Sequence, residues 1–143
     1  MQGTIYMSAE PLCDVLVVDD EPDTLHLAQK ILEKENFTVR TAANGEEALQ
    51  LIKKRGVIPR LMLLDIMMPR GDGWFVLETL KKDEKYKKII FILFTVKGFT
   101  KDFERAKALG ADGYITKPFS GDGLVENIRE RLKSSKKDKK NTF

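Results

Sequence analysis

The sequence predicts a doubly wound α/β domain, in which helices cover both faces of a five-stranded parallel sheet. Five apolar runs recur along the 143 residues, and stretches with apolar residues at helical spacing separate them. Strands that alternate with helices are typical of a parallel sheet. Three of the runs are almost continuously apolar, as expected for strands buried on both faces. A chain of this length forms about one domain with a sizeable core.

Each expected strand is an apolar run that a helical pattern follows. The runs cover residues 15–18, 37–41, 61–64, 89–94 and 113–116. The second run is mixed in polarity, and we therefore expect it at an edge of the sheet. We predict the strand order 2-1-3-4-5, in which the order reverses between the first and third strands. Ligands of doubly wound sheets bind at that point, outside the carboxyl ends of the strands.

The helices between the strands have recognisable starts and stops. Pro22 suits the first turn of the first helix. Asn44, with Glu47 three residues later, resembles a capping box and predicts a second helix that continues until Gly56. The other three are expected to begin near Asp72, near residue 99 and after Ser120, and the fourth ends at Gly110, a residue typical of helix C-termini.

The net charge of +3 comes from the C-terminal segment. Residues 133–143 hold five lysines and one aspartate, a net charge of +4, so the other 132 residues carry −1. We therefore divide the chain into an N-terminal extension (1–12), a domain (13–133) and a basic tail or linker (134–143) that we expect to be disordered. The nearly neutral body argues against nucleic acid as a partner of the domain itself.

Composition also bounds the cellular setting. No apolar run approaches the roughly 18 residues that a membrane span needs, so no membrane partner is expected. Cys13 is the only cysteine, which excludes an internal disulfide and favours a reducing, cytoplasmic location.

Four of the five strands end on a residue that can handle a phosphoryl group. The first is followed by Asp19 and Asp20, the third by Asp65, the fourth by Thr95, and the fifth by Lys117. Parallel strands bring these residues to one edge. Two carboxylates about 4 Å apart repel by roughly 4 kcal/mol at an effective dielectric of 20, so the cluster needs a cation. Oxygen ligands suit Mg²⁺, and an aspartate can act as the nucleophile in phosphoryl transfer. The alternative interpretation is purely structural: each acid only caps the helix after it.

Four motifs together resemble the receiver domain of bacterial two-component response regulators. They are Val18-Asp-Asp-Glu, Leu63-Leu-Asp-Ile-Met-Met-Pro-Arg-Gly-Asp-Gly, Phe94-Thr and Tyr114-Ile-Thr-Lys-Pro-Phe. The resemblance covers roughly residues 13–133 and implies a flavodoxin-like (βα)5 fold. It also implies a signalling switch rather than a conventional enzyme, with at most self-phosphorylation and autodephosphorylation as activities.

The resemblance assigns a role to each residue of the acidic end of the site. Asp65 is expected to accept a phosphoryl group from a histidine kinase or a phosphotransfer protein. Asp19, Asp20, Asp65 and the backbone carbonyl of Met67 are expected to bind Mg²⁺ or Mn²⁺.

The remaining implied roles concern sensing of the phosphoryl group. Lys117 would pair with Asp65 and then with phosphoryl oxygens, and the Lys117–Pro118 peptide bond would be cis. The Thr95 hydroxyl would donate to a phosphoryl oxygen, and Tyr114 would move inward with it. Val96 follows Thr95 where the family often has alanine or glycine, and could alter phosphorylation or hydrolysis rates.

The resemblance implies an output through the face of the fourth helix, fifth strand and fifth helix. That output would be a separate partner or a C-terminal output domain outside this sequence, with a homodimer on phosphorylation as a further expectation. Two alternatives stay open. One is a protein-interaction module that works without phosphorylation. The other is an Asp-nucleophile phosphohydrolase, whose Asp-x-Asp motif after the first strand does not match Asp19-Asp20-Glu21.

Overall fold

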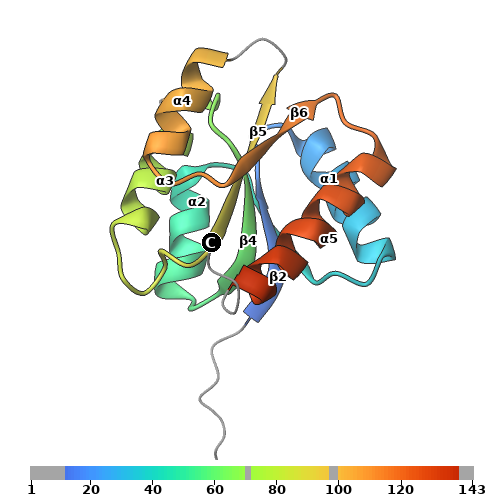
Figure 1. The fold of residues 1–143 in the computed structure, drawn as a ribbon, viewed down its shortest axis with the longest axis horizontal. Coiled ribbons are helices and arrows are strands. Elements are labelled where there is room, and N and C mark those ends of the chain that lie inside the picture. The colour runs from blue at the N-terminus through green and yellow to red at the C-terminus, as the bar shows by residue number, and fades with distance from the viewer. Residues whose placement is uncertain (1–11, 70–71, 97–99, 139–143) are drawn as a thin grey trace, which may run out of the picture.

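The computed structural model describes residues 12–69, 72–96 and 100–138, and its strands and helices alternate as predicted (Figure 1). In chain order the elements are β2 (Leu12–Val18), α1 (Pro22–Lys34), β3 (Val39–Ala42), α2 (Gly45–Leu49), the π-helix η2 (Gln50–Lys54), β4 (Ile58–Asp65), α3 (Asp72–Lys81), β5 (Ile90–Val96), α4 (Thr100–Ala108), β6 (Gly113–Lys117) and α5 (Gly121–Asp138). None of the helices within these ranges is both long and apolar enough to cross a membrane.

All strand pairs are parallel, in the order β3-β2-β4-β5-β6. This confirms the predicted order 2-1-3-4-5, with the mixed-polarity strand β3 at an edge. The register pairs Val18 with Leu64 and Asp65 with Phe94. The carboxyl ends of β2, β4 and β5 therefore lie side by side, at the point where the strand order reverses.

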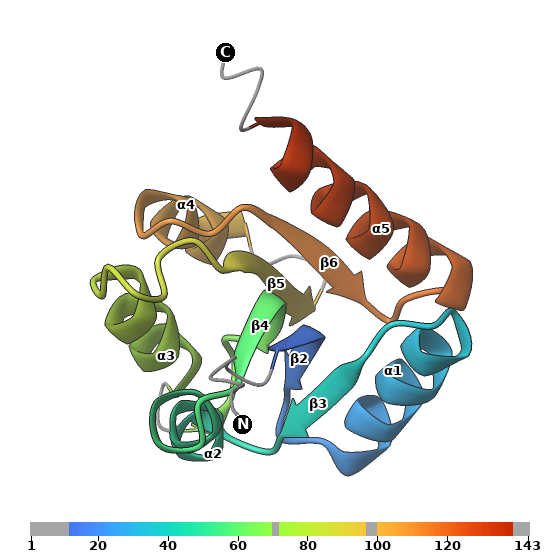
Figure 2. The same cartoon turned by 90° about the horizontal axis from the view of Figure 1, so that it is seen from below.

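The helices form a layer on each face of the sheet. Figure 2 shows α2, α3 and α4 on one side and α1 and α5 on the other. Successive side chains of a strand point to opposite faces, so β4 contributes to both cores. Leu61 and Leu63 pack with the core under α1 and α5, whereas Met62 and Leu64 pack with the core under the other three helices. All four are fully buried, which explains their continuous apolar run.

The helix after Asn44 differs from its prediction in one respect. The predicted cap is confirmed, because Asn44 Oδ1 accepts a hydrogen bond from the amide of Glu47 at 2.8 Å, while the Glu47 carboxylate accepts from the Ala43 amide, one residue before the cap. The α-helix ends at Leu49, however, and the chain continues as a π-helix to Lys54. A π-turn holds one residue more than an α-turn, and the local apolar spacing did not reveal it.

The C-terminal helix extends past the predicted domain boundary at residue 133. Helix α5 continues to Asp138, so the first five residues of the expected tail are helical. Lysine is a good helix former, and cations near a helix C-terminus interact favourably with the helix dipole. Residues 139–143 and the N-terminal residues 1–11 lie outside the described part of the chain.

Candidate functional site

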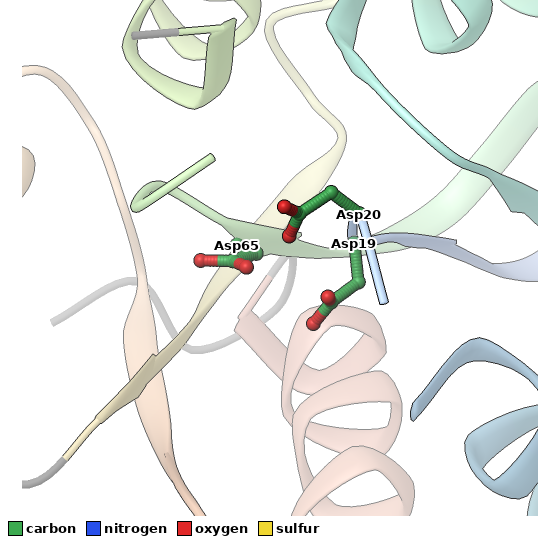
Figure 3. Close-up of side chains that lie close together, drawn as sticks. All are labelled: Asp19, Asp20 and Asp65. Atoms are coloured by element: carbon green, nitrogen blue, oxygen red, sulfur yellow. The ribbon is translucent and has the colours of Figure 1, made fainter. Parts of the chain in front are cut away.

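Three carboxylates meet at the carboxyl ends of β2 and β4 (Figure 3). Asp19 and Asp20 directly follow β2, and Asp65 is the last residue of β4. Each offers one oxygen such that the three atoms lie within 4.8 Å of one another. Asp19 and Asp65 are buried, with exposed fractions of 0% and 4%, whereas Asp20 is exposed. A buried pair of acids with one exposed acid beside it leaves the cluster accessible from solvent on one side.

Local backbone hydrogen bonds orient the two buried acids in the same way. Asp19 Oδ1 accepts from the amide of Glu21 at 2.9 Å, and Asp65 Oδ1 accepts from the amide of Met67 at 2.8 Å. Both are bonds from an aspartate to the backbone two residues later, a pattern that aspartate favours in turns. Each acid therefore keeps its Oδ2 atom for a tertiary partner.

That partner is Lys117, the last residue of β6. Its Nζ atom donates to Asp19 Oδ2 at 2.8 Å and to Asp65 Oδ2 at 3.3 Å. Glu21 Oε1 lies 3.9 Å from the same ammonium, and the Phe94 ring lies beneath it with its centroid 5.1 Å away. The Lys117–Pro118 peptide bond is cis, the isomer that the resemblance implies. One ammonium thus joins the ends of β2, β4 and β6.

The balance of burial and charge shifts two pKa values. Burial raises the pKa of Asp65, and the Asp19 charge adds to this, against the lowering effects of the Met67 amide and Lys117. Burial alone would lower the pKa of Lys117. The hydrogen bond to Asp19 and the charges of Asp65 and Asp19 outweigh it, so this pKa is raised. Lys117 is therefore a cation at neutral pH, held by the surplus of carboxylates.

The cluster has the composition of a divalent-cation site. Asp19, Asp20 and Asp65 carry three negative charges, and Lys117 supplies one positive charge. The surplus of two negative charges and the hard oxygen ligands fit Mg²⁺ or Mn²⁺. Met67 lies two residues after Asp65 in the sequence, and its side chain is exposed.

The side chains of two expected sensing residues contact partners other than the acids. The Thr95 hydroxyl donates to the carbonyl oxygen of Val96 at 3.4 Å. Within the described ranges it makes no hydrogen bond to Asp65 or Lys117. Tyr114 is 49% exposed and contacts the Phe103 ring edge-on, with centroids 4.7 Å apart. The structure therefore brings together the acids and the lysine, while the hydroxyl and the aromatic ring contact Val96 and Phe103.

Two contributors to the site, Glu21 and Phe94, lie in the quoted motifs but were assigned no role from the sequence. Glu21 suited the first turn of a helix, and its approach to Lys117 has no local signal. Phe94 belonged to an apolar run, and nothing local distinguishes its place under an ammonium from ordinary core packing. The only signal in the sequence for a site role of Glu21 is its position directly after Asp19 and Asp20.

The sequence is similar to known proteins over most of its length. The model of the response regulator receiver domain matches residues 15–129. The response regulator Rre1 of Synechocystis sp. is 35% identical over 125 residues, 87% of this chain and 53% of its own length. The response regulator SaeR of Staphylococcus aureus is 38% identical over 123 residues, 86% of this chain and 52% of its own length. The chain thus spans about half the length of the curated relatives it matches.

Solved structures give the same result. A CheY-like response regulator receiver domain protein from Methanospirillum hungatei superposes with a TM-score of 0.80 at 31% identity, covering 89% of this chain and 98% of that one. The receiver domain of NtrX from Brucella abortus superposes with a TM-score of 0.75 at 34% identity, covering 85% of this chain and 99% of that one.

Proposed function

The chain belongs to the response regulator receiver domain family, and from this premise we propose that Asp65 is the phosphoacceptor of a two-component signalling switch. The observation that carries the proposal is the contact set of Lys117, whose ammonium lies 2.8 Å from Asp19 and 3.3 Å from Asp65. This arrangement joins a nucleophile, a cation ligand and a neutralising charge in one site. An aspartate that only caps the following helix would need none of these contacts.

The proposed reaction is transfer of a phosphoryl group to Asp65. A carboxylate oxygen forms a bond to phosphorus as the bond between phosphorus and the donor's imidazole nitrogen breaks. The electron pair stays on that nitrogen, and the imidazole leaves neutral after it takes up a proton. The amide of Met67 orients the carboxylate, and Lys117 passes from the carboxylate to the oxygens of the new phosphoryl group. Its charge favours the product, because a phosphoryl group is more negative than the carboxylate it modifies.

Asp19, Asp20, Asp65 and the Met67 carbonyl would hold Mg²⁺ or Mn²⁺ in this proposal. When bound, such an ion neutralises charge on the transferred phosphoryl oxygens. The surplus of two negative charges around Lys117 supports this ligand set.

Switching would use Thr95 and Tyr114, whose side chains now contact Val96 and Phe103. The Thr95 hydroxyl would break its hydrogen bond to the Val96 carbonyl and donate to a phosphoryl oxygen instead. The present bond is long, at 3.4 Å, and therefore weak, so its loss costs little free energy. Tyr114 would leave the edge of Phe103 and turn inward. Both changes alter the surface of α4, β6 and α5, so a partner that prefers one arrangement reads the phosphorylation state.

The proposed phosphodonor is a histidine kinase or a phosphotransfer protein in the cytoplasm, a location that the single cysteine supports. The proposed output is a separate protein, or a domain joined to this one in a longer chain. A homodimer formed on phosphorylation is a further candidate for the output state.

Intact-mass measurement tests the phosphoacceptor directly. The protein is incubated with Mg²⁺ and acetyl phosphate, beside an Asp65→Asn variant and a sample with excess EDTA. We expect the wild type to gain the mass of one phosphoryl group, and neither control to gain it. Equal modification of the variant would place the phosphoryl group elsewhere, and no modification of the wild type would favour a module that works without phosphorylation.

A further inference from the structure

The outer edge of β3 carries a cavity that the phosphoryl site does not use. Its volume is about 380 Å³, within the range of small-molecule sites. Side chains from α1, β3, α2 and η2 line it, and none of the acids at the ends of β2 and β4 is among them. The cavity is therefore a separate place at which a ligand could bind.

Two arginines give this cavity a positive character. Arg40 and Arg55 both line it, and neither guanidinium forms a hydrogen bond or an ion pair with any residue in the described ranges. The one carboxylate in the lining belongs to Glu47, whose Oε1 already accepts from the Ala43 amide at 2.9 Å. The lining carries a net charge of +1. Paired guanidiniums match the oxygens of phosphate and carboxylate groups.

Backbone groups at the sheet edge add donors. The carbonyl oxygen of Thr38 accepts from two amides of β2 at 3.0 and 3.1 Å, and that of Ala42 accepts from the Asp19 amide, directly after β2, at 3.1 Å. Peptide groups alternate in direction along a strand, so those of Val39 and Thr41 face away from β2. Both residues line the cavity. As β3 is an edge strand, these groups have no sheet partner within the described chain.

The π-helix brings its residues to this same cavity. The amide of Arg55 bonds to the carbonyl of Gln50, five residues earlier, at 3.1 Å. In an α-helix, residues five apart differ by roughly 140° in direction and lie on different sides. Here Gln50 begins the π-helix and Arg55 directly follows it, and both residues line the cavity. Single π-turns occur frequently at functional sites.

We propose that this cavity binds a small dianion with a phosphate or dicarboxylate head group. Arg40 and Arg55 pair with its charges, and the Gln50 amide and the Thr41 hydroxyl bind its remaining oxygens. The proposal does not depend on phosphorylation of Asp65.

The test is a titration followed in ¹H–¹⁵N NMR spectra, without divalent metal, using sodium phosphate, succinate, and sodium chloride at matched ionic strength. We expect saturable shifts of the Thr41 and Gln50 amides with at least one of the two dianions. An Arg40→Gln/Arg55→Gln variant should bind about tenfold more weakly. Saturation with only one dianion identifies the head group and supports the proposal.

The matched control is Lys53→Gln/Lys54→Gln, which removes the same charge from exposed residues of η2 that do not line the cavity. Its affinity should stay within about twofold of the wild type. Asp65→Asn should titrate like the wild type, which separates this site from the phosphoryl site. If the double arginine variant does not fold, Arg55→Lys replaces it and should still weaken binding. Shifts that chloride reproduces, or equal loss in the arginine and lysine variants, overturn the proposal.

Discussion

Replacing Lys117 by methionine should destabilise the metal-free protein strongly. The change removes the ammonium and keeps the length of the side chain, so Asp19 and Asp65 lose the cation that lies 2.8 Å and 3.3 Å from them. Breaking a buried ion pair on one side costs about 3–5 kcal/mol. The Lys117 side chain is 15% exposed, which favours the lower part of this range.

Protonation of Asp65 sets an upper limit on the cost. The variant can relieve the repulsion by protonating Asp65, whose ordinary pKa is 3.8. At pH 7 this costs about 1.4 kcal/mol for each pH unit above that pKa, or about 4 kcal/mol. We therefore expect the free energy of unfolding at pH 7 to fall by about 2–4 kcal/mol.

Urea denaturation followed by fluorescence of Trp74, the only tryptophan, measures this change. The control is Lys30→Met on the exposed surface of α1, which should alter stability by less than about 0.5 kcal/mol. Saturating Mg²⁺ should stabilise Lys117→Met more than the wild type, because the ion no longer competes with an ammonium for the acids. Equal stabilities of the two lysine variants, or no larger gain with Mg²⁺, would refute the electrostatic account of the site.

Three further outcomes are expected. Asp65→Asn should raise the midpoint of metal-free thermal unfolding at pH 7. Burial and the Asp19 charge raise the Asp65 pKa, so the folded protein prefers a neutral side chain at this position. The increase in the midpoint should shrink as the pH falls toward 3.8, because Asp65 itself then becomes protonated. Gly73→Ala should lower the free energy of unfolding in urea by more than about 2 kcal/mol, because the added methyl group would overlap backbone atoms of Asp65 and Ile66. The control Gly121→Ala should be nearly neutral, because its methyl group would lie 3.6 Å from the nearest neighbouring atom. Burial raises the pKa of the Cys13 thiol from 9.0 to about 11, so native protein at pH 8 should react with a disulfide reagent at least about a hundredfold more slowly than urea-unfolded protein.

Local patterns predicted the fold because each element carries its own signal. The central strands lie between two helical layers, so nearly all their residues are apolar, and they were found near their true positions. The start of β4 was harder to predict. The strand begins at Ile58, three residues before the predicted start, and Arg60 within it pairs with Asp14 of β2 at 3.2 Å. A charged residue in a strand becomes interpretable only when its partner on the next strand is known.

The π-turn after Leu49 had no such signal. Apolar spacing predicted a continuous helix to Gly56, and the actual chain changes its turn at Gln50. An α-helical turn and a π-helical turn of the same sequence place different side chains on one face of the helix. The amino-acid composition of the segment therefore does not distinguish them. In the folded chain Leu51 and Ile52 of η2 are buried in the core under α2, α3 and α4, and the local pattern does not encode that packing.

By itself the sequence determined which chemical groups reach the carboxyl edge of the sheet, because a strand end followed by Asp, Thr or Lys is a local feature and parallel topology aligns such ends. Only the tertiary structure decided how those groups pair. Lys117 lies nearer to Asp19 than to Asp65, and the Thr95 hydroxyl bonds to Val96 instead of the acids. These choices depend on ångström-scale distances between elements that are 52 and 98 residues apart in the chain. Burial and packing set such distances, and residue spacing along the chain does not encode them.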